Sequence, residues 1–435
     1  MVDSPKWRND KRIASTLRRL IMPALPSTIP NTSFTRGVNA IPLSLPLGVI
    51  MPRVEELTNT HSKLPPELTD RVIDHLHDDA RSLRACALVC RAWLPRARYH
   101  LFHDISLSLS HGRHKLRFER FDRLLECYPH LGYFVRKLSM RGSSSSLPQK
   151  SYSRTLARMP NVTNIIWTEA FFHPSAAFDR FKYLTGLHLE NYGFPSLNDF
   201  ASLICSLSHL EELSCTSVRA AECTSIVTPF LFSPLPSLRR LHFDNVVMSH
   251  IMFTRWISTN SMHTHLDSLT LLSILPDHLS AWIVLVKSAG PSLRRFAVSP
   301  QHPHVLGTLL RIDRLDLSPC TQLQSLGFGD RDFDFDTLTA LREFFCGRIP
   351  DSIQEVIVSV TDVNKFLKFE SVVGWNRFIE VLLLEKYLYF GRFVISVLTR
   401  TAALDDHGVA LIKERFMEFY SMGRLEVEIC GNKVV

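Results

Sequence analysis

Three side chains in the middle of the chain have types and spacing that suit the binding of an anion: Arg240, His242 and Arg295. A guanidinium grips a carboxylate or a phosphate through two parallel hydrogen bonds. Arg240 and His242 are two residues apart, so in a β-strand they point to the same face. A simpler alternative stays open, in which the arginines only keep an exposed surface hydrated.

Metal and catalytic chemistry find little support in the sequence. His263 with His265, and His302 with His304, have a spacing that would chelate a metal from an extended strand, but we interpret them as surface histidines. The chain has no Gly-rich phosphate loop, no Gly-x-Ser-x-Gly and no His-Glu-x-x-His. Its nine cysteines form no close Cys-x-x-Cys pair, and we interpret them as small buried side chains. We therefore predict no catalytic residue, no metal, no cofactor and no enzymatic activity.

The elements that must carry the arginines recur as one pattern, apolar-x-x-apolar-x-apolar. Ten copies follow one another at intervals of 22 to 30 residues between their middle positions. Those middle residues are Leu138, Ile165, Leu187, Leu213, Leu241, Leu269, Phe296, Leu326, Val356 and Leu382. Such regular intervals indicate internal repeats, and helical patterns such as residues 277–289 lie between them. Two further copies, centred on Leu315 and Leu425, fall outside this spacing and are expected to mark an insertion and a terminal cap.

Each repeat is thus a strand, a loop and a helix, and such units bury their apolar faces by stacking into a curved solenoid. The pattern resembles a degenerate leucine-rich repeat, which implies a parallel sheet on the concave face. Its polar residues Asn191, Asn245 and Asp330 come four positions after the middle apolar residue, where the usual pattern has five, so the asparagine ladder is expected to be absent or shifted. An irregular α/β domain is the alternative.

The period of two in a strand sends the residues on either side of each middle position outward. The outward residues of this region are Glu212, Ser214, Arg240, His242, Ser268, Thr270 and Arg295. Strands of one sheet lie about 4.8 Å apart, so Arg240 and Arg295, two repeats apart, are expected roughly 10 Å from each other. We predict that Arg240, His242 and Arg295 bind an acidic or phosphorylated peptide of a target protein.

A second element, residues 64–93, holds more apolar side chains than its size can bury. Leu64-Pro65-Pro66 predicts a helix from about Glu67, with an apolar stripe of Leu68, Val72, Ile73 and Leu76. Asp78-Asp79 predicts the N-cap of a second helix over residues 80–93, ended by Pro95. That helix is apolar on two sides, and about thirty residues cannot cover both. We therefore expect a partner on one of them.

These residues resemble the F-box family, whose pattern is Leu-Pro-x-Glu-Leu, an aliphatic pair ending in Leu, and Val-Cys-x-x-Trp. Here the elements are residues 64–68, Val72-Ile73 with Leu76, and residues 89–93. The resemblance, to F-box proteins of the fungal type with repeat domains, implies docking on a Skp-type adaptor and, through it, a cullin. The chain would then be the substrate receptor of a Skp–cullin–F-box ubiquitin ligase. The adaptor-binding residues that the motif suggests are Leu64, Pro65, Leu68, Ile73, Leu76, Val89 and Trp93.

Three alternatives to this interpretation stay open. The helices of residues 64–93 could form an ordinary subdomain packed on the rest of the same chain. The whole chain could also be a repeat interaction scaffold unrelated to ubiquitin ligation, or a nucleic-acid-associated protein with a basic tail. Binding to an isolated adaptor separates these possibilities.

Composition sets the remaining expectations. The net charge is +8, and +5 of it falls in the first fifty residues, so we expect no specific nucleic-acid binding. The longest apolar run, residues 38–52, is too short for a membrane span and is broken by Pro42 and Pro46. We predict a disordered basic tail over residues 1–60, an F-box over 61–104 and a solenoid over 105–435. We expect a cytoplasmic or nuclear protein, with organelle import through the basic tail as the alternative.

Overall fold

The computed structural model describes residues 65–435 except 109–112, 143–148, 170–180, 222–237, 303–304, 312–314, 331–332, 361–365, 367–368, 385–386, 388–389, 398–405, 430–431 and 434–435. The predicted tail and Leu64 therefore lie outside the described residues. The described chain forms two compact units. The first holds residues 65–101 with Glu119–Leu124, and the second holds Phe102–Phe118 with Leu125–Val435.

The first unit contains α2 (Pro66–Asp74), α3 (Ala80–Val89) and most of α4 (Leu94–His103). The proline at the start of α2 and the Asp79 cap of α3 are confirmed, since the Asp79 carboxylate accepts from the backbone N–H groups of Arg81 and Ser82. The predicted end of the second helix is wrong. The chain leaves α3 at Cys90 in an extended conformation, and Pro95 lies in the first turn of α4, where a missing N–H costs nothing.

The second unit is built on one 13-stranded sheet, in the order β1-β2-β3-β4-β6-β8-β9-β10-β11-β12-β13-β14-β15. The strands are β1 (Asp104–Ser108), β2 (Lys137–Arg141), β3 (Asn164–Thr168), β4 (Gly186–Glu190), β6 (Glu212–Thr216), β8 (Arg240–Asp244), β9 (Ser268–Ile274), β10 (Arg295–Pro300), β11 (Ser325–Asp330), β12 (Glu355–Val360), β13 (Arg392–Val397), β14 (Leu425–Ile429) and β15 (Asn432–Lys433). All pairs are parallel except β14 with β15. A small parallel pair joins β5 (Gly193–Phe194) to β7 (Arg219–Ala220).

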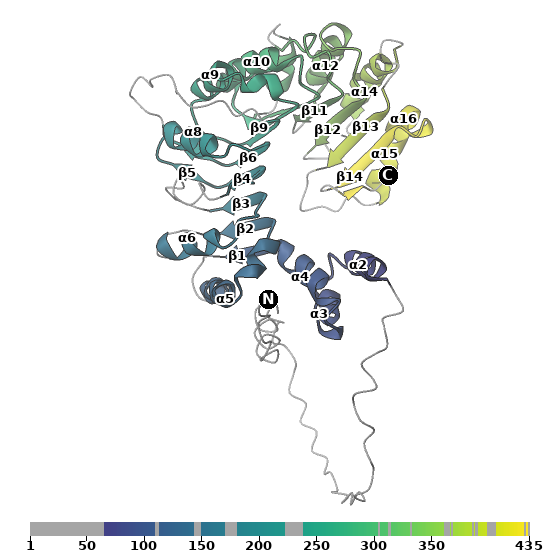
Figure 1. The fold of residues 1–435 in the computed structure, drawn as a ribbon. Coiled ribbons are helices and arrows are strands. Elements are labelled where there is room, and N and C mark those ends of the chain that lie inside the picture. The colour runs from purple at the N-terminus through teal and green to yellow at the C-terminus, as the bar shows by residue number, and fades with distance from the viewer. Residues whose placement is uncertain are drawn as a thin grey trace, which may run out of the picture. The chain divides into compact units, whose positions relative to one another are not determined.

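Helices connect successive strands and lie on the outer side of the curved sheet (Figure 1). They are α5 (Arg113–Cys127), α6 (Gln149–Ala157), α8 (Leu197–Ser206), α9 (His250–Thr259), α10 (Pro276–Ala289), α11 (Val305–Arg311), α12 (Phe335–Gly347), α14 (Phe369–Leu382), α15 (Asp406–Arg415) and α16 (Met417–Ser421), with short 3-10 turns at η2 (Pro129–Phe134) and η4 (Met262–His265). The strands line the inner side. The predicted α/β solenoid with a parallel sheet is confirmed.

Nine of the ten predicted repeat copies are strands, and each of their middle residues is at most 3% exposed. The tenth is wrong, because Leu382 lies in α14 and the strand of that repeat is β13, centred on Phe393. Apolar residues three apart also share one face of a helix, which makes a single copy of the pattern ambiguous. Leu425 is the start of a regular strand, β14, and no cap, while Leu315 is buried outside any strand.

In several repeats, the polar residue four positions after the middle apolar residue ends the strand. Glu169, Asn191, Ser217 and Asn245 have φ between 50° and 61°, a left-handed conformation that asparagine tolerates well. Each donates its backbone N–H to a carbonyl of the next strand, as Asn191 does to Thr216 at 2.9 Å. The two asparagines are exposed, so they form turn positions and no buried ladder.

His250 in α9 is a buried polar group of the helical layer, 2% exposed. Its Nδ1 accepts a hydrogen bond from Trp282 Nε1–H at 3.1 Å, and its Nε2–H donates to the Val246 carbonyl at 3.1 Å. Burial, together with the neighbouring ring of His278 4.0 Å away, lowers the pKa of His250 to about 4. The folded chain therefore holds His250 neutral.

We expect this residue to make the fold acid-sensitive. As pH falls from 6.5 to 4, the unfolded chain takes up a proton on residue 250 before the folded chain does, so stability is complete above pH 6.5 and is lost towards pH 4. The loss in the free energy of unfolding is about 3 kcal/mol. Urea unfolding at several pH values, compared with His250→Gln, measures it. If the free energy of unfolding still fell with pH in His250→Gln but no longer did so in the exposed control His209→Gln, the assignment of this pH dependence to His250 would be contradicted.

Candidate functional site

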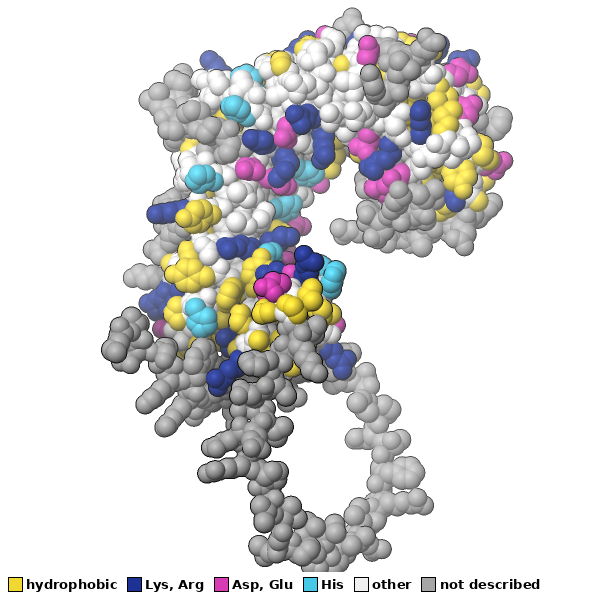
Figure 2. Space-filling model, turned by 45° about the vertical axis from the view of Figure 1, so that its right-hand side comes forward, with side chains coloured by type: hydrophobic (Ala, Val, Ile, Leu, Met, Phe, Trp, Pro, Cys, Tyr) yellow, Lys and Arg dark blue, Asp and Glu magenta, His cyan; other side chains and the backbone are white. Residues whose placement is uncertain are grey.

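Four apolar side chains of the first unit are open to solvent. Leu68 and Val72 in α2 are 47% and 56% exposed, and Leu88 and Val89 in α3 are 74% and 61% exposed. Hydrophobic side chains gather on the surface over these helices (Figure 2). Exposed apolar side chains that lie together are candidates for contact with another protein or a membrane. We call these four residues the apolar docking surface.

The opposite sides of the same helices make a small core. Ile73, Leu83, Cys86 and Ala97 are at most 8% exposed, and Leu76, Ala87, Trp93 and Leu101 pack against them. One apolar side of α3 therefore packs in the core of the first unit, and the other side faces solvent.

The predicted adaptor-binding residues are split by this division. Pro65, Leu68 and Val89 are exposed, whereas Ile73 is fully buried, so its expected place on the surface is corrected to the core. Leu76 and Trp93 are half-buried against that core. Leu64 lies outside the described residues. The predicted adaptor-binding residues did not include Val72, which the motif contains, or Leu88, which is the neighbour of Val89, because periodicity does not tell which flank of a stripe turns inward.

An ion cluster holds α2 to α4 in the first unit. The Asp74 carboxylate accepts hydrogen bonds from Arg96 Nε and Nη2, the latter at 2.7 Å, and from His100 Nε2 at 2.7 Å. The hydrogen bonds from Arg96 hold the pKa of Asp74 far below its usual range, against the opposing effect of burial, and His100 adds to the lowering. The first unit is thus held together by its own core and by this ion cluster, the Asp74 clamp. Its apolar docking surface takes no part in either and is exposed to solvent.

The inner face of the sheet carries the second predicted surface. Register places Arg240, Ser268 and Arg295 side by side on β8, β9 and β10, which confirms the predicted row. Both arginines are exposed. Beyond β10 the inner face is less open, since Ser325 and Gly327 on β11 are buried, whereas Arg392 on β13 is exposed again.

The charges of this face are already partly paired. Arg240 Nη2 lies 3.0 Å from Glu212 Oε2, and Arg392 Nε donates to Glu355 Oε1 at 2.7 Å. Burial lowers the pKa of His242, so its imidazole is neutral near pH 7 and adds no positive charge to the row. Of the three predicted target-binding residues, Arg295 stands between uncharged neighbours, Ser268 and Ser325.

Other candidate chemistry does not assemble. No group of three or more His, Cys, Asp or Glu side chains in the described part of the chain could hold a metal ion. Cys86, Cys215 and Cys320 are buried as expected, but Cys90, Cys127 and Cys346 are exposed, and Cys205 is intermediate. His304 lies outside the described residues. Among the described helices, none has the length and apolar character of a membrane span.

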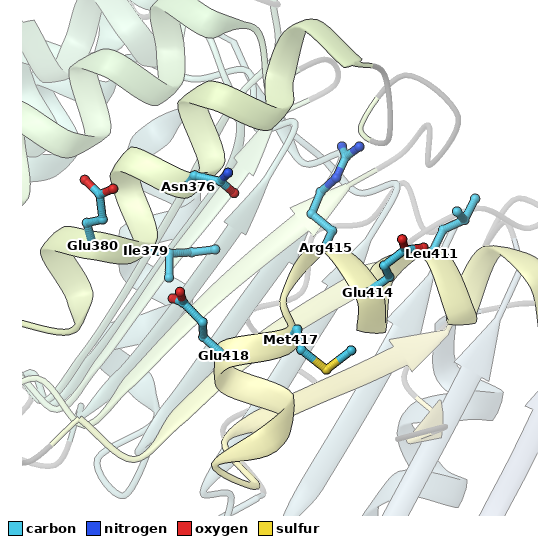
Figure 3. Close-up of a pocket in the computed structure, with 8 residues that line it drawn as sticks. All are labelled: Asn376, Ile379, Glu380, Leu411, Glu414, Arg415, Met417 and Glu418. Carbon is cyan, nitrogen blue, oxygen red and sulfur yellow. The ribbon is translucent and has the colours of Figure 1, made fainter.

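A hollow of about 580 Å³ lies between α14, α15 and α16 (Figure 3). Its lining mixes carboxylates with apolar groups: Asn376, Ile379, Glu380, Leu411, Glu414, Arg415, Met417 and Glu418. Arg415 Nη1 donates to the Phe366 carbonyl at 3.3 Å, and burial lowers the pKa of this guanidinium. None of the residues predicted from sequence lies here.

Comparison with known proteins yields remote likenesses. No family model and no curated protein matches the chain. A chain in the crystal structure of the Rad7 and Elc1 complex in yeast is 12% identical with a TM-score of 0.34, over 80% of this chain and 85% of that one. A chain of the Toll–Spatzle complex from Drosophila is 12% identical with a TM-score of 0.27, over 71% of this chain and 46% of that one. Neither likeness bears on function.

Proposed function

We propose that this chain is a non-enzymatic substrate receptor of a cullin-type ubiquitin ligase. Its first unit binds a Skp-type adaptor through the apolar docking surface, and the open inner face of the sheet binds a target protein. The observation that carries the proposal is the coincidence of an F-box-like motif with bare apolar side chains on α2 and α3, among them Leu68 and Val89 of the motif itself.

The energetic reason for a partner lies in the same side chains. Burying an aliphatic side chain gains roughly 1.5 to 3 kcal/mol relative to leaving it in water, and four such side chains are exposed within the first unit. The core and the Asp74 clamp already satisfy the other sides of the helices. A protein with a complementary apolar groove would gain this energy on docking, whereas a self-contained helical subdomain would leave it unused.

The role of such a receptor is positional. Ubiquitin transfer is performed by other subunits, and the receptor holds a target lysine near them, which converts an encounter between separate molecules into an effectively intramolecular step. We place this activity in the cytoplasm or the nucleus. A repeat scaffold unrelated to ubiquitin ligation is the alternative.

Reconstitution with the adaptor tests the proposal. The full chain is co-expressed with a Skp-type adaptor and analysed by size-exclusion chromatography, and we expect a stable one-to-one complex at micromolar concentration. Elution of the two proteins in separate peaks at that concentration would overturn the receptor proposal and favour the scaffold. If the complex forms, addition of the cullin is expected to give a ternary complex.

A further inference from the structure

Two rows of side chains cross the sheet where its strands begin. The first row consists of Glu211, Arg239, Asp267, Arg294 and Gln324, and the second row consists of Glu212, Arg240, Ser268, Arg295 and Ser325. Backbone hydrogen bonds between the strands fix both rows. The carbonyl of each first-row residue accepts hydrogen bonds from the two N–H groups at the start of the next strand. The Asp267 carbonyl, for example, accepts from Arg294 and Arg295 at 2.8 and 3.0 Å.

Between β6 and β11 these rows hold one more arginine than carboxylates. In the first row Asp267 stands between Arg239 and Arg294. In the second row Glu212 pairs with Arg240, while Arg295 has a serine on each side. On the far side, Ser325 donates to Glu355 at 2.6 Å, and Glu355 is engaged by Arg392. Arg295 is therefore the arginine of the second row that has no carboxylate at the paired positions of the neighbouring strands.

The surroundings of Arg295 leave room for a ligand and supply further donors. The neighbouring outward positions are Ser268, Thr270, Ala297 and Gly327, all small. The floor is close-packed, since a Cβ on Gly327 would meet the Ala297 Cβ at 2.8 Å. The hydroxyls of Ser268 and Thr270 are half-buried on the adjacent strand, within the same patch of the inner face. The exposed Arg295 side chain is thus surrounded by small side chains, and the adjacent strand supplies the hydroxyl groups of Ser268 and Thr270.

We propose that Arg295 anchors the target by binding a carboxylate side chain in the target's recognition segment, with the hydroxyls of Ser268 and Thr270 as further donors. This inference rests on the proposed function, because it assumes that the ligand is a protein. From β6 to β11 the two rows hold four arginines and three carboxylates, those of Glu211, Glu212 and Asp267, and beyond them Glu355 and Glu426 share Arg392. This part of the sheet therefore carries at most one net positive charge. An Asp or Glu side chain supplies one negative charge, whereas a phosphoserine supplies nearly two at pH 7. The charge balance therefore favours the carboxylate.

The test uses peptide libraries as probes. Nine-residue peptides of random Ala, Gly, Ser and Leu carry a fixed central Glu, Gln or phosphoserine, and retention of each library is measured on the immobilised full chain. We expect the Glu library to be retained over the Gln library. Loss of a charge-assisted hydrogen bond costs about 1.5 to 3 kcal/mol, so Arg295→Gln is expected to weaken retention of the Glu library at least tenfold. The comparison variant is Arg240→Gln on the same row. Because the Arg240 guanidinium is paired with Glu212, the inference removes Arg240 from the predicted target-binding set, and this variant is expected to change retention less than threefold.

Three outcomes would overturn the inference. Equal losses in Arg295→Gln and Arg240→Gln would show general attraction to a basic face, and no loss in either would move the site elsewhere. Stronger Arg295-dependent retention of the phosphoserine library would assign the site to phosphate. Adaptor binding is measured on the same variants and is expected to be unchanged. A failure of the receptor proposal would appear in that adaptor measurement and not in the peptide libraries, so the two failures are distinguishable.

Discussion

The variant Val89→Asp is expected to abolish adaptor binding and to leave the chain folded. Val89 is 61% exposed in the free chain, so an aspartate at this position stays hydrated there and costs little stability. In a complex the same carboxylate would be buried without a partner, which costs several kcal/mol. A penalty of about 3 kcal/mol or more lowers affinity more than a hundredfold. The measurement is adaptor affinity by calorimetry, with circular dichroism to confirm the helices.

The best control is a valine of equal exposure elsewhere. Val284 in α10 of the second unit is 59% exposed, so Val284→Asp introduces the same charge at a comparable surface position. We expect it to bind the adaptor with unchanged affinity. Ile73→Asp is the opposite case, since Ile73 is fully buried and the charge would disrupt the core of the first unit. Equal adaptor affinity for Val89→Asp and Val284→Asp would show that the apolar docking surface is not the adaptor site.

Much of the fold follows from the period of the apolar residues, because a strand repeated at near-constant intervals leaves few other architectures. The pattern located β2, β3, β4, β6 and β8 to β12 by their middle residues and set the outward direction of Arg240 and Arg295. It failed at the C-terminal end, where α14 takes up the expected strand and β13 begins ten residues later. The reason is that three-residue spacing between apolar side chains fits a helix as well as a strand, and only long-range packing decides between them.

The binding surfaces were less predictable than the fold. The F-box-like motif identifies the helices, but which apolar flank turns outward depends on how α2, α3 and α4 pack together, and this placed Ile73 inside and Val72 outside. Similarly, the sequence treats Arg240 and Arg295 alike. They differ because strand order brings Glu212 beside one and serines beside the other, a long-range pairing that no local pattern contains.

The largest loss of stability is expected from Trp375→Ala in α14. The indole is fully buried, and its ring lies 5.0 Å from Phe366, 5.4 Å from Phe416 and 5.7 Å from Phe333. It thereby links α14 to the chain that leads into α16. Replacing a buried Trp by Ala removes these contacts and leaves a cavity, at a cost of about 3 to 5 kcal/mol.

A second variant, Trp375→Phe, separates the effect of the ring from that of its polar atom. The indole Nε1–H has no hydrogen-bond partner among the described residues, so Trp375→Phe keeps an aromatic ring and removes an unsatisfied buried donor, which costs about 1 to 3 kcal/mol when left unpaired. The smaller ring loses some contacts, and we expect the two effects nearly to cancel, with a net change below about 1 kcal/mol. Val373→Ala, at a position 48% exposed on the same helix, is the surface control and is also expected to change little.

Urea unfolding followed by circular dichroism measures the three variants. Because each repeat is stabilised mainly by its neighbours, Trp375→Ala is expected to loosen the last repeats first and to expose β13 and β14 to protease at low urea. Adaptor binding by the first unit should persist in this variant, since the apolar docking surface has its own core. Trp375→Ala and Trp375→Phe unfolding at the same urea concentration would mean that the aromatic cluster around this indole does not hold the C-terminal repeats together.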